Sequence, residues 1–547
     1  MRQGELSLNL QDHVEAVEGR LAAWEAGDFG GRLLAGDPTI WSERPDPEIT
    51  NRLGWLELPG KSPGQLDDII SFADQVRSEG FRHVVLMGMG GSSLAPKVFQ
   101  LTFGNSVNHP ELITVDTPHP EAVRDVNTRI EPGETLFAVA SKSGRTIEPL
   151  TLFRHFWREA GRRVREPGQN FIAITDAGTP LEDLAEEKGF RKTFFAEPDL
   201  GGRYSALTAY GLVPAALIGV DVGKLLERAG IAARSVSTAL CLGAALGELA
   251  LRGRDKLTFF TSPSVAHFPV WLEQLIAEST GKDGRGVLPV VGEPAIDPSR
   301  YGNDRFFVNL EIDGEEVPCF RDDLLAQLEA AGHPVATIFL SDAYDIGREV
   351  FRWEVAVASA GAVLGINPFN QPDVELSKEL SRRAMASGGK EDLGVESINT
   401  ENGEILRERL EAWLGDAGRG DCISIQAYLQ PSEPTSDLLG QARQALLDRT
   451  SLATTMDYGP QFLHSTGQLH KGGPGTGLFL QIVDGTDGEL EVPGEPHSFN
   501  DLIRAQSIGD FVALKRRGRR ILRVDLEEDV ERGLRTLETV LHQHPGS

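Results

Sequence analysis

The sequence predicts an α/β protein made of two doubly wound domains with mainly parallel sheets, an N-terminal helical cap and a C-terminal α/β extension. Short apolar runs of strand length alternate with helical segments from residue 66 to residue 400, which is the pattern of a parallel sheet covered by helices. Glycine- or serine-rich turns follow several of these runs. The 547 residues also exceed what one core usually holds.

Composition limits the classes of partner. The chain is 40% hydrophobic and 25% charged, with a net charge of −27 that repels nucleic acid and acidic membranes. No run approaches the roughly 20 apolar residues of a membrane span, and the N-terminus lacks the apolar core of a secretory signal. Cys241, Cys319 and Cys422 are far apart, which fits a reducing cytoplasm better than disulfides or a cysteine zinc site. We therefore expect a cytoplasmic protein whose anionic substrate needs a local basic pocket.

The chain divides into four expected parts. Residues 1–65 form a cap with a helix at 12–26, and residues 66–235 form a first α/β unit. A second unit covers 236–400, with a linker at 388–403, and an extension covers 401–547. The expected strands are 83–87, 112–115, 135–140 and 171–175 in the first unit, 257–261, 306–312 and 335–340 in the second, and 422–429, 478–483 and 521–524 in the extension.

Two stretches of the extension carry specific expectations. We expect residues 455–475 to be irregular. The basic run Lys515–Arg520 is more typical of a solvated turn than of a nucleic-acid patch in so acidic a chain.

A glycine-rich turn, 88–93, lies between a predicted strand and a predicted helix. Its Gly91 and Ser92 would let an anion approach the backbone N–H groups at the helix start. The spacing matches neither the dinucleotide pattern nor a nucleotide-triphosphate loop, and a tight βα turn is the simpler explanation of this stretch alone.

A second turn of the same kind follows the strand at 135–140. Ser141, Ser143 and Thr146 supply three hydroxyls, and Lys142 and Arg145 supply two cations. Helix capping explains one of the hydroxyls but not this whole set, whereas a phosphate monoester needs several short hydrogen bonds. Two such turns in one sheet favour a phosphosugar site.

The third candidate is the end of an apolar helix at 268–276. Gln274 and Glu278 are four residues apart and share one helical face, and Gly281 ends the helix. A carboxylate in such a place can act as a proton-transfer base. On this stretch alone, a solvated surface glutamate is the more common explanation.

These stretches, with three others, resemble the glucose-6-phosphate isomerase family, which consists of two sugar-isomerase (SIS) type α/β domains. The resemblance covers residues 88 to 468. It is carried by Gly90-Gly-Ser-Ser, Ser141-Lys-Ser…Thr146, Asp199-Leu-Gly-Gly-Arg-Tyr-Ser-Ala, Gln274…Glu278-Ser-Thr-Gly-Lys, Asn367-Pro-Phe-Asn-Gln-Pro-Asp-Val-Glu-Leu-Ser-Lys378 and Phe462-Leu-His-Ser-Thr-Gly-Gln468.

The resemblance implies roles for single residues. Glu278 would be the base that moves a proton between C2 and C1 through a cis-enediol, and Arg203 would stabilise the negative charge that develops. Lys378 and His464 would assist ring opening, and Gln371, two turns before Lys378 on the same helical face, would orient sugar hydroxyls. Simpler explanations are a buried salt bridge for Arg203, an i, i+3 pair with Glu375 for Lys378, and a structural loop histidine for His464, with His470 as its rival. Gly91, Ser92, Ser141, Lys142, Ser143, Thr146, Gln274 and Gln371 would bind the substrate.

Two departures from the family pattern stand out. Asp373 replaces the glycine of the second signature, which adds a negative charge at a helix start. The histidine segment follows Lys378 instead of preceding it, as in the isomerase half of fused transaldolase–isomerase proteins. A transaldolase barrel would need about 250 further residues, so the expectation is an isomerase alone.

The leading hypothesis is a cofactor-free enzyme that interconverts D-glucose 6-phosphate and D-fructose 6-phosphate, with no metal. The family implies a homodimer in which the neighbouring subunit supplies the histidine. Alternatives are a dual-specificity phosphoglucose/phosphomannose isomerase and a non-catalytic sugar-phosphate-sensing SIS protein. The sugar-binding half of an amidotransferase is disfavoured because no cysteine lies near the N-terminus.

Overall fold

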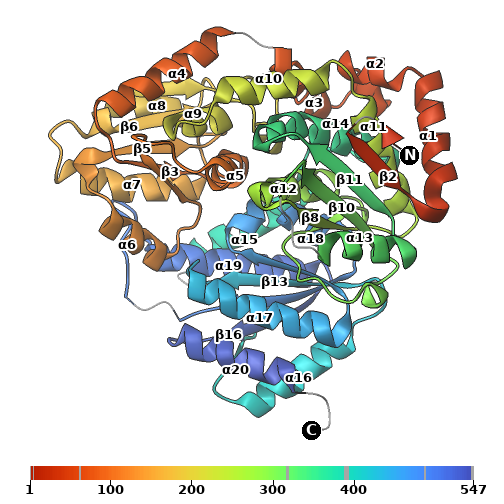
Figure 1. Ribbon diagram of the computed structural model, residues 1–547. Helices are drawn as coiled ribbons and strands as arrows, with labels where there is room; N and C mark the ends of the chain where they lie inside the picture. Colours follow the sequence, from red (N-terminus) through yellow and green to blue (C-terminus); the bar gives the residue numbers. More distant parts are fainter. Residues whose placement is uncertain are drawn as a thin grey trace.

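The computed structural model describes residues 2–3, 5–60, 63–315, 320–386, 394–485 and 488–543. Three α/β units surround a common centre: the first lies at the left of Figure 1, the second at the right and the third at the bottom. Cys319 and residues 388–393 of the expected linker lie outside the described residues.

The first unit is a five-stranded sheet in which every neighbouring pair of strands is parallel. Numbered along the chain, its strands have the order 2-1-3-4-5, which is that of a doubly wound fold. The strands are β4 (Glu111–Val115), β3 (His83–Met87), β5 (Thr135–Ala140), β6 (Phe171–Thr175) and β7 (Lys192–Phe195). The helices are α4 (Pro63–Ser78), α5 (Leu94–Phe103), α6 (Pro120–Arg129), α7 (Ile147–Gly161), α8 (Pro180–Lys188) and α9 (Ala209–Leu217).

The second unit has a six-stranded sheet in the order β1-β2-β11-β10-β8-β9. Its four parallel strands repeat the winding of the first sheet, since in chain order they read 4-3-1-2. The strands are β1 (Arg2–Gln3), β2 (Leu6–Asn9), β11 (Val335–Leu340), β10 (Arg305–Ile312), β8 (Lys256–Thr261) and β9 (Leu288–Val290). The helices are α10 (Val222–Ala233), α11 (Ser237–Leu251), α12 (Phe268–Thr280), α13 (Phe320–Ala330) and α14 (Ile346–Leu364).

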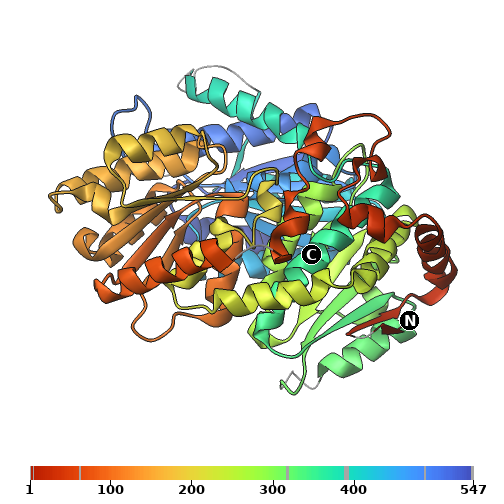
Figure 2. The ribbon, with the colours of Figure 1, turned by 90° about the horizontal axis from the view of Figure 1, so that it is seen from above.

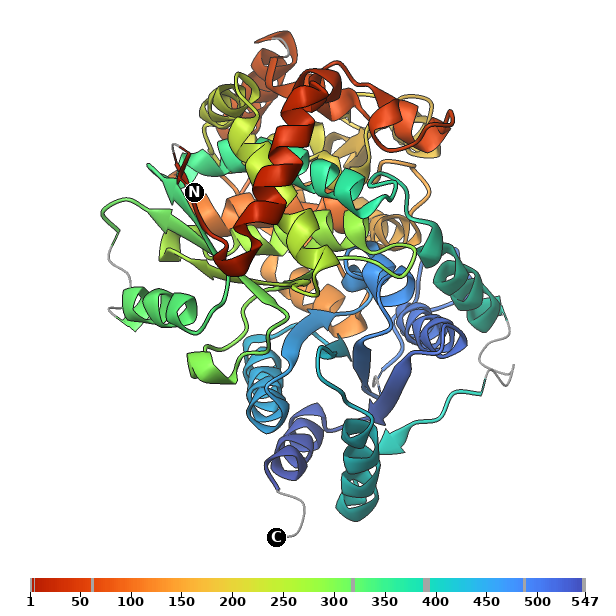
Figure 3. The same ribbon diagram turned by 90° about the vertical axis from the view of Figure 1, so that its right-hand side faces the viewer.

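The N-terminal part contains the helices of the expected cap and also a strand that the sequence interpretation did not expect. Its helices α1 (Val14–Ala26), α2 (Phe29–Leu34) and α3 (Pro47–Thr50) are present, but β2 precedes them and pairs antiparallel with β11. Leu6 and Leu8 are buried while their neighbours are half-buried. This period of two is the strand signal that the interpretation overlooked. Helix α1 stands out at the front of Figure 3 and at the right edge of Figure 2.

The third unit shows that the C-terminal extension is itself a doubly wound domain. Its sheet is entirely parallel, and β13 to β16 again have the order 4-3-1-2. The strands are β12 (Ile398–Asn399), β16 (Arg520–Asp525), β15 (Gly477–Val483), β13 (Cys422–Tyr428) and β14 (Ala453–Tyr458). The helices are α15 (Glu375–Ala386), α16 (Gly403–Gly415), α17 (Glu433–Thr450), α18 (Gly467–Gly472), α19 (Phe499–Arg516) and α20 (Val530–His542).

The expectation that residues 455–475 are irregular was wrong. Most of β14 and all of α18 fall in this stretch, and a short 3₁₀ turn, Gln461–His464, connects them. Strand β14 forms an edge of the sheet and α18 has only six residues, so neither gives a long periodic pattern.

Two helices pack across the expected domain limits. Helix α10, inside the expected range 66–235, packs against α14 of the second unit, and α15, inside 236–400, packs against α19 of the third. The limits therefore stay a prediction. In the described part of the chain, no single helix has the length and apolar character of a membrane span; only the bent pair α10 and α11 meets these criteria jointly.

Candidate active site

Helix α12 places Glu278 at the centre of the molecule. The helix begins with Pro269 in its first turn, which suits a helix start, and Glu278 is buried near its end. A carboxylate oxygen of Glu278 lies 3.0 Å from a terminal nitrogen of Arg203, and both side chains are almost completely buried. A buried ion pair of this kind needs further hydrogen bonds to offset the loss of solvation.

Arg203 supplies those bonds and joins three separate segments. Its Nε donates to Ser279 Oγ at 2.8 Å, and a terminal nitrogen donates to the carbonyl oxygens of Pro368 (2.7 Å) and Asn370 (3.0 Å). The contact with Glu278 is therefore compatible with both expected roles of Arg203, the buried salt bridge and the stabilisation of negative charge beside the base. The planar guanidinium fixes the distance between the base helix and the Asn367–Lys378 segment.

Gln274 connects the base helix to the histidine segment. Its Nε2 donates to Glu278 Oε2 at 3.1 Å, which agrees with the predicted shared helical face, and to the carbonyl oxygen of His464 at 2.8 Å. Residues 190 positions apart thus meet at this amide.

His464 contacts a glutamate that the sequence interpretation did not single out. Its Nε2 lies 3.1 Å from Glu148 Oε1, and Gln506 Nε2 donates to the same oxygen at 2.6 Å. Burial alone would raise the pKa of Glu148, but the charge and hydrogen bond of His464, with the Gln506 amide, lower it below its usual value. The available signal was an acidic residue in the first turn of α7, which usually reflects only the helix dipole.

The rival histidine, His470, occupies a different environment. It is buried, and its Nδ1 lies 3.2 Å from Gln426 Nε2. Burial, together with the charges of Lys471 and Arg519, holds the pKa of His470 well below its usual range. His470 is therefore a neutral packing residue, whereas His464 lines the central cavity.

The two predicted phosphate turns flank the point where the winding of the first sheet reverses. The turn 88–93 follows β3, and Ser141–Thr146 follows β5, the adjacent parallel strand. Ligands of doubly wound sheets bind at this switch point. A Cβ atom on Gly91 would lie 2.0 Å from the carbonyl oxygen of Gly202, so only glycine allows the first turn to approach the Arg203 segment this closely.

Within the second turn the hydroxyls have different environments. Ser141 is buried and donates to Thr146 Oγ1 at 3.0 Å, and Lys142 forms an ion pair with Asp176. Thr146 is the N-cap residue of α7, yet among the described residues its side chain makes no capping bond. Capping therefore does not account for this hydroxyl, and the first N–H groups of α7 face the same turn.

The Asn367–Lys378 segment differs from the expected geometry in one respect. Gln371 lies before a short 3₁₀ turn, Pro372–Val374, and α15 begins only at Glu375, so Gln371 and Lys378 do not share a helical face. The proline at position 372 prevents one continuous helix from residue 371 onwards. Lys378 is paired with Glu375 at 2.7 Å, which is the i, i+3 contact that the simpler explanation expected.

One cavity of about 1320 Å³ collects nearly all these groups. It is lined by segments of all three units. Of the predicted residues it takes in Gly91, Ser92, Lys142, Ser143, Thr146, Arg203, Gln274, Glu278, Gln371, Lys378 and His464; Ser141 lies behind the lining.

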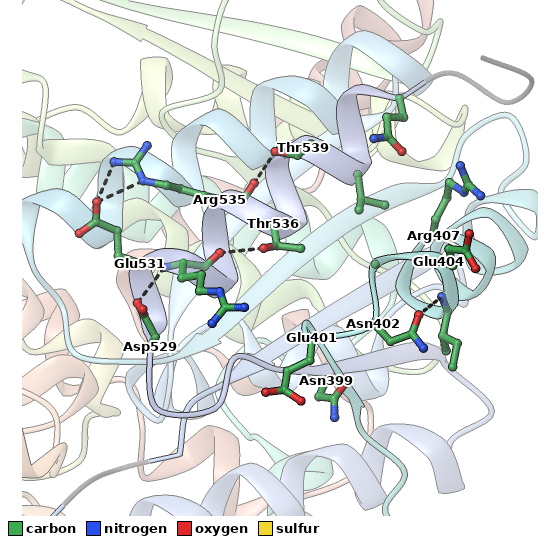
Figure 4. Close-up of a pocket in the computed structure, with 15 residues that line it drawn as sticks. Asn399, Glu401, Asn402, Glu404, Arg407, Asp529, Glu531, Arg535, Thr536 and Thr539 are labelled. Atoms are coloured by element: carbon green, nitrogen blue, oxygen red, sulfur yellow. Dashed lines mark hydrogen bonds and ion pairs between the residues drawn. The ribbon is translucent and has the colours of Figure 1, made fainter.

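A second hollow of similar volume, about 1280 Å³, lies in the third unit between α16 and α20 (Figure 4). None of the predicted site residues lines it, and its Arg535 is paired with Glu531 on the same helix. Among the described residues, no group of three or more His, Cys, Asp or Glu side chains is arranged to hold a metal ion.

Comparison with known proteins finds matches over much of the chain. Residues 66–284, which contain both turns, Arg203 and Glu278, match the family model described as Phosphoglucose isomerase. Glucose-6-phosphate isomerase of Staphylococcus saprophyticus is 28% identical over 393 residues, covering 62% of this chain and 88% of that protein. The enzyme of the same name from Rubrobacter xylanophilus is 28% identical over 432 residues, covering 68% of this chain and 96% of that protein.

Solved structures share the fold. A hypothetical protein from Thermus thermophilus aligns with a TM-score of 0.58 at 26% identity, covering 70% of this chain and all of that one. A glucose-6-phosphate isomerase from Chlamydia trachomatis aligns with a TM-score of 0.53 at 19% identity, covering 66% of this chain and 79% of that one. The chain is thus similar to the phosphoglucose isomerase family over residues 66–284 and to curated glucose-6-phosphate isomerases at 28% identity.

Proposed function

We propose that the protein is an aldose–ketose isomerase that interconverts D-glucose 6-phosphate and D-fructose 6-phosphate. The observation that carries this proposal is the buried pair of Glu278 and Arg203, 3.0 Å apart, in the cavity that also contains the two switch-point turns. A base, a cation beside it and an anion-binding turn are the groups that a sugar-phosphate isomerase needs.

The turns hold the phosphate. The N–H groups at the start of α7, the hydroxyls of Ser143 and Thr146 and the cation of Lys142 suit a phosphate monoester. Held there, the sugar would extend towards α12 and the histidine segment, whose side chains line the same cavity.

Ring opening comes first in the proposed mechanism. His464 takes the proton of the anomeric hydroxyl and Lys378 supports proton delivery to the ring oxygen, which leaves the open-chain aldehyde or ketone. Glu148 orients His464 through the 3.1 Å contact.

Proton transfer follows. The Glu278 carboxylate removes the proton from C2 of the aldose, and the electron pair of that bond forms the C1–C2 double bond of the cis-enediol. The carbonyl oxygen takes up a proton, and Arg203 stabilises the negative charge on the oxygens meanwhile. Return of the proton from Glu278 to C1, with loss of the C2 hydroxyl proton as C2 becomes the carbonyl carbon, gives the ketose. The proton lost from the C2 oxygen balances the one that the C1 oxygen took up.

Two parts of the sequence interpretation remain predictions. The contact of His464 with Glu148 within one chain supports a histidine that acts in its own chain's site, while the homodimer itself is an expectation from the family. The cytoplasmic location is an expectation from cysteine usage and from the sequence of the N-terminus.

The test compares two glutamates of the same helix. Fructose 6-phosphate is supplied with EDTA present, and glucose 6-phosphate is detected through a coupled dehydrogenase. Wild type should turn over, and Glu278→Gln should lower kcat by about 100- to 10,000-fold, as expected for loss of a general base. Glu273→Gln, the same change one and a half turns away, should keep kcat within about twofold of wild type.

Three outcomes would change the proposal. Folded wild type that binds a sugar phosphate without turnover would indicate a sensor. Comparable turnover of mannose 6-phosphate would indicate dual specificity. Full activity of Glu278→Gln would mean that another group is the base.

A further inference from the structure

Asp373 has a structural partner that explains why it stands where the resembled signature has glycine. Its backbone N–H donates to Gln468 Oε1 at 3.0 Å, and its Oδ2 accepts from Gln468 Nε2 at 2.7 Å. Gln468 belongs to α18, directly after the His464 turn, and is completely buried. The two residues therefore form a reciprocal pair of hydrogen bonds between the second signature and the histidine segment.

The same amide reaches the base helix. Gln468 Nε2 also donates to the carbonyl oxygen of Gly281 at 2.9 Å, immediately after α12 ends. Asp373 requires a glycine at position 472, because a Cβ atom there would lie 2.2 Å from Asp373 Oδ2. Only Gly472 lets the carboxylate reach Gln468 across the end of α18.

Two arginines of the basic run Lys515–Arg520, which was expected to be a solvated turn, contact Asp373 and the end of α18. Arg517 lies 2.5 Å from Asp373 Oδ1. Arg519 donates to the carbonyl oxygens of Lys471 (2.8 Å) and Gly473 (2.7 Å) at the end of α18. Cations at a helix C-terminus satisfy carbonyl groups that have no partner in the helix.

These contacts converge on the groups assigned to ring opening. Asp373 lies two residues after Gln371 and five before Lys378, and its partner Gln468 lies four residues after His464. We propose that Asp373 is a positioning residue that fixes the histidine segment of the third unit against the second signature of the same chain. The inference rests on the proposed function, because ring opening is the step that needs both segments.

The first measurement is kinetic, with fructose 6-phosphate as substrate. Asp373→Gly should lower kcat about 10- to 100-fold, the cost of displacing a catalytic group by about 1 Å. KM should stay within about twofold, since the phosphate turns lie on other elements. Asp373→Asn can still accept the Gln468 hydrogen bond and should recover most of the loss.

Asp421→Gly is the matched control. Asp421 has the same side-chain exposure as Asp373, 12%, and is paired with Arg520 of the same basic run at 2.7 Å. The variant should keep kcat within about twofold, because its contact does not reach the histidine segment. Equal losses in both glycine variants would mean general destabilisation and would overturn the proposal.

A double-variant cycle isolates the pair. Gln468→Leu removes the side-chain hydrogen bond that Asp373→Gly also removes, together with the bonds to the N–H of residue 373 and to the Gly281 carbonyl oxygen, so the double variant should be no slower than Gln468→Leu alone. If the losses in kcat of the two single variants multiplied in the double variant, the two residues would act independently, against the proposal.

Hydrogen exchange tests the positioning without relying on turnover. In Asp373→Gly, amides of residues 461–473 should exchange faster than in wild type, while the Asp421→Gly control leaves them unchanged. Unchanged protection in Asp373→Gly would overturn the proposal. If wild type had no isomerase activity, the proposed function would fail, and this readout would still decide the positioning role.

Discussion

Helix α12 carries two buried glutamates, Glu273 and Glu278, whose surroundings differ. Glu278 faces the cavity and is paired with the guanidinium of Arg203 at 3.0 Å. Glu273 lies five residues earlier, about 140° around the helix, and is hydrogen-bonded to another carboxyl group, that of Asp457 on β14. The charge of Arg443 also acts on Glu273, in the direction that lowers its pKa.

These different surroundings change the protonation of the carboxyl pair formed by Glu273 and Asp457. Burial and the neighbouring Asp457 raise the pKa of Glu273, and burial raises the pKa of Asp457 to about 6. Two carboxyl groups in contact share a proton because both cannot ionise there. Burial on α12 is therefore common to both glutamates, and what separates a candidate base from a structural contact is a cationic partner and access to the cavity.

Replacing the cation at each glutamate would give the largest expected difference. Arg203→Lys keeps the charge but loses the fork that reaches Ser279, Pro368 and Asn370, so kcat should fall about 100- to 1,000-fold. The measurement is kcat in the coupled assay.

Arg443→Lys is the matched change beside Glu273. Arg443 is also buried and also binds carbonyl oxygens, those of Val291 and Gly292. It should lower the melting temperature but leave kcat within about twofold, as expected away from the chemistry. Similar kcat losses in both lysine variants would remove the distinction between the two glutamates.

Glu148 extends the comparison, because it too is a buried glutamate, and its partner is the imidazole of His464. Glu148→Gln keeps the shape but removes the carboxylate that contacts and orients His464, and kcat should fall up to about 100-fold. Glu159→Gln, on the same helix and paired with the surface residues Arg158 and Arg162, is the control and should change little. If kcat of Glu148→Gln equalled that of wild type, Glu148 would be a structural contact, as Glu273 is expected to be.

The smallest effect concerns pH and stability. A carboxyl group whose pKa is raised on folding stabilises the protein below its unfolded pKa, and this contribution is lost as pH rises through the folded value. The melting temperature of wild type should therefore fall between pH 5 and pH 7, through the value of about 6 for Asp457. Asp457→Asn should remove this component and leave kcat nearly unchanged.

Glu273→Gln should flatten the same part of the stability curve, and the double variant should flatten it no further, because the pair binds one proton. The measurement is the melting temperature of each protein from pH 5 to pH 8. If the melting temperatures of wild type and Asp457→Asn changed with pH in parallel, folding would not alter the pKa values of the two carboxyl groups, against the prediction.

Local sequence patterns were sufficient to predict much of the fold and several cavity-lining residues. The strands at 83–87, 135–140 and 171–175 appear with the predicted limits, because apolar runs bounded by turns depend on local chemistry. The spacing of Gln274 and Glu278 likewise gave their contact, since helical neighbours four residues apart lie on the same face.

Contacts between distant segments could not be predicted in this way. Glu148 looked like an ordinary first-turn acid until His464 was placed against it, 316 residues away. Gln371 was expected on a helix, but the helix begins only at Glu375, after Pro372. Ser141 was expected to bind substrate, but it lies behind the cavity lining and donates a hydrogen bond to Thr146. None of these features has a periodic signal in the sequence.

The sequence by itself determined the α/β class, the position of the two turns at 88–93 and 141–146 and the glutamate at the end of an apolar helix. Only the tertiary structure decided that the C-terminal part is a third doubly wound unit, and that Asp373 and Gln468 join it to the other two. Helix and strand periods arise from neighbours within a few residues, whereas the pairing of buried polar groups depends on which distant segments share the low-dielectric interior.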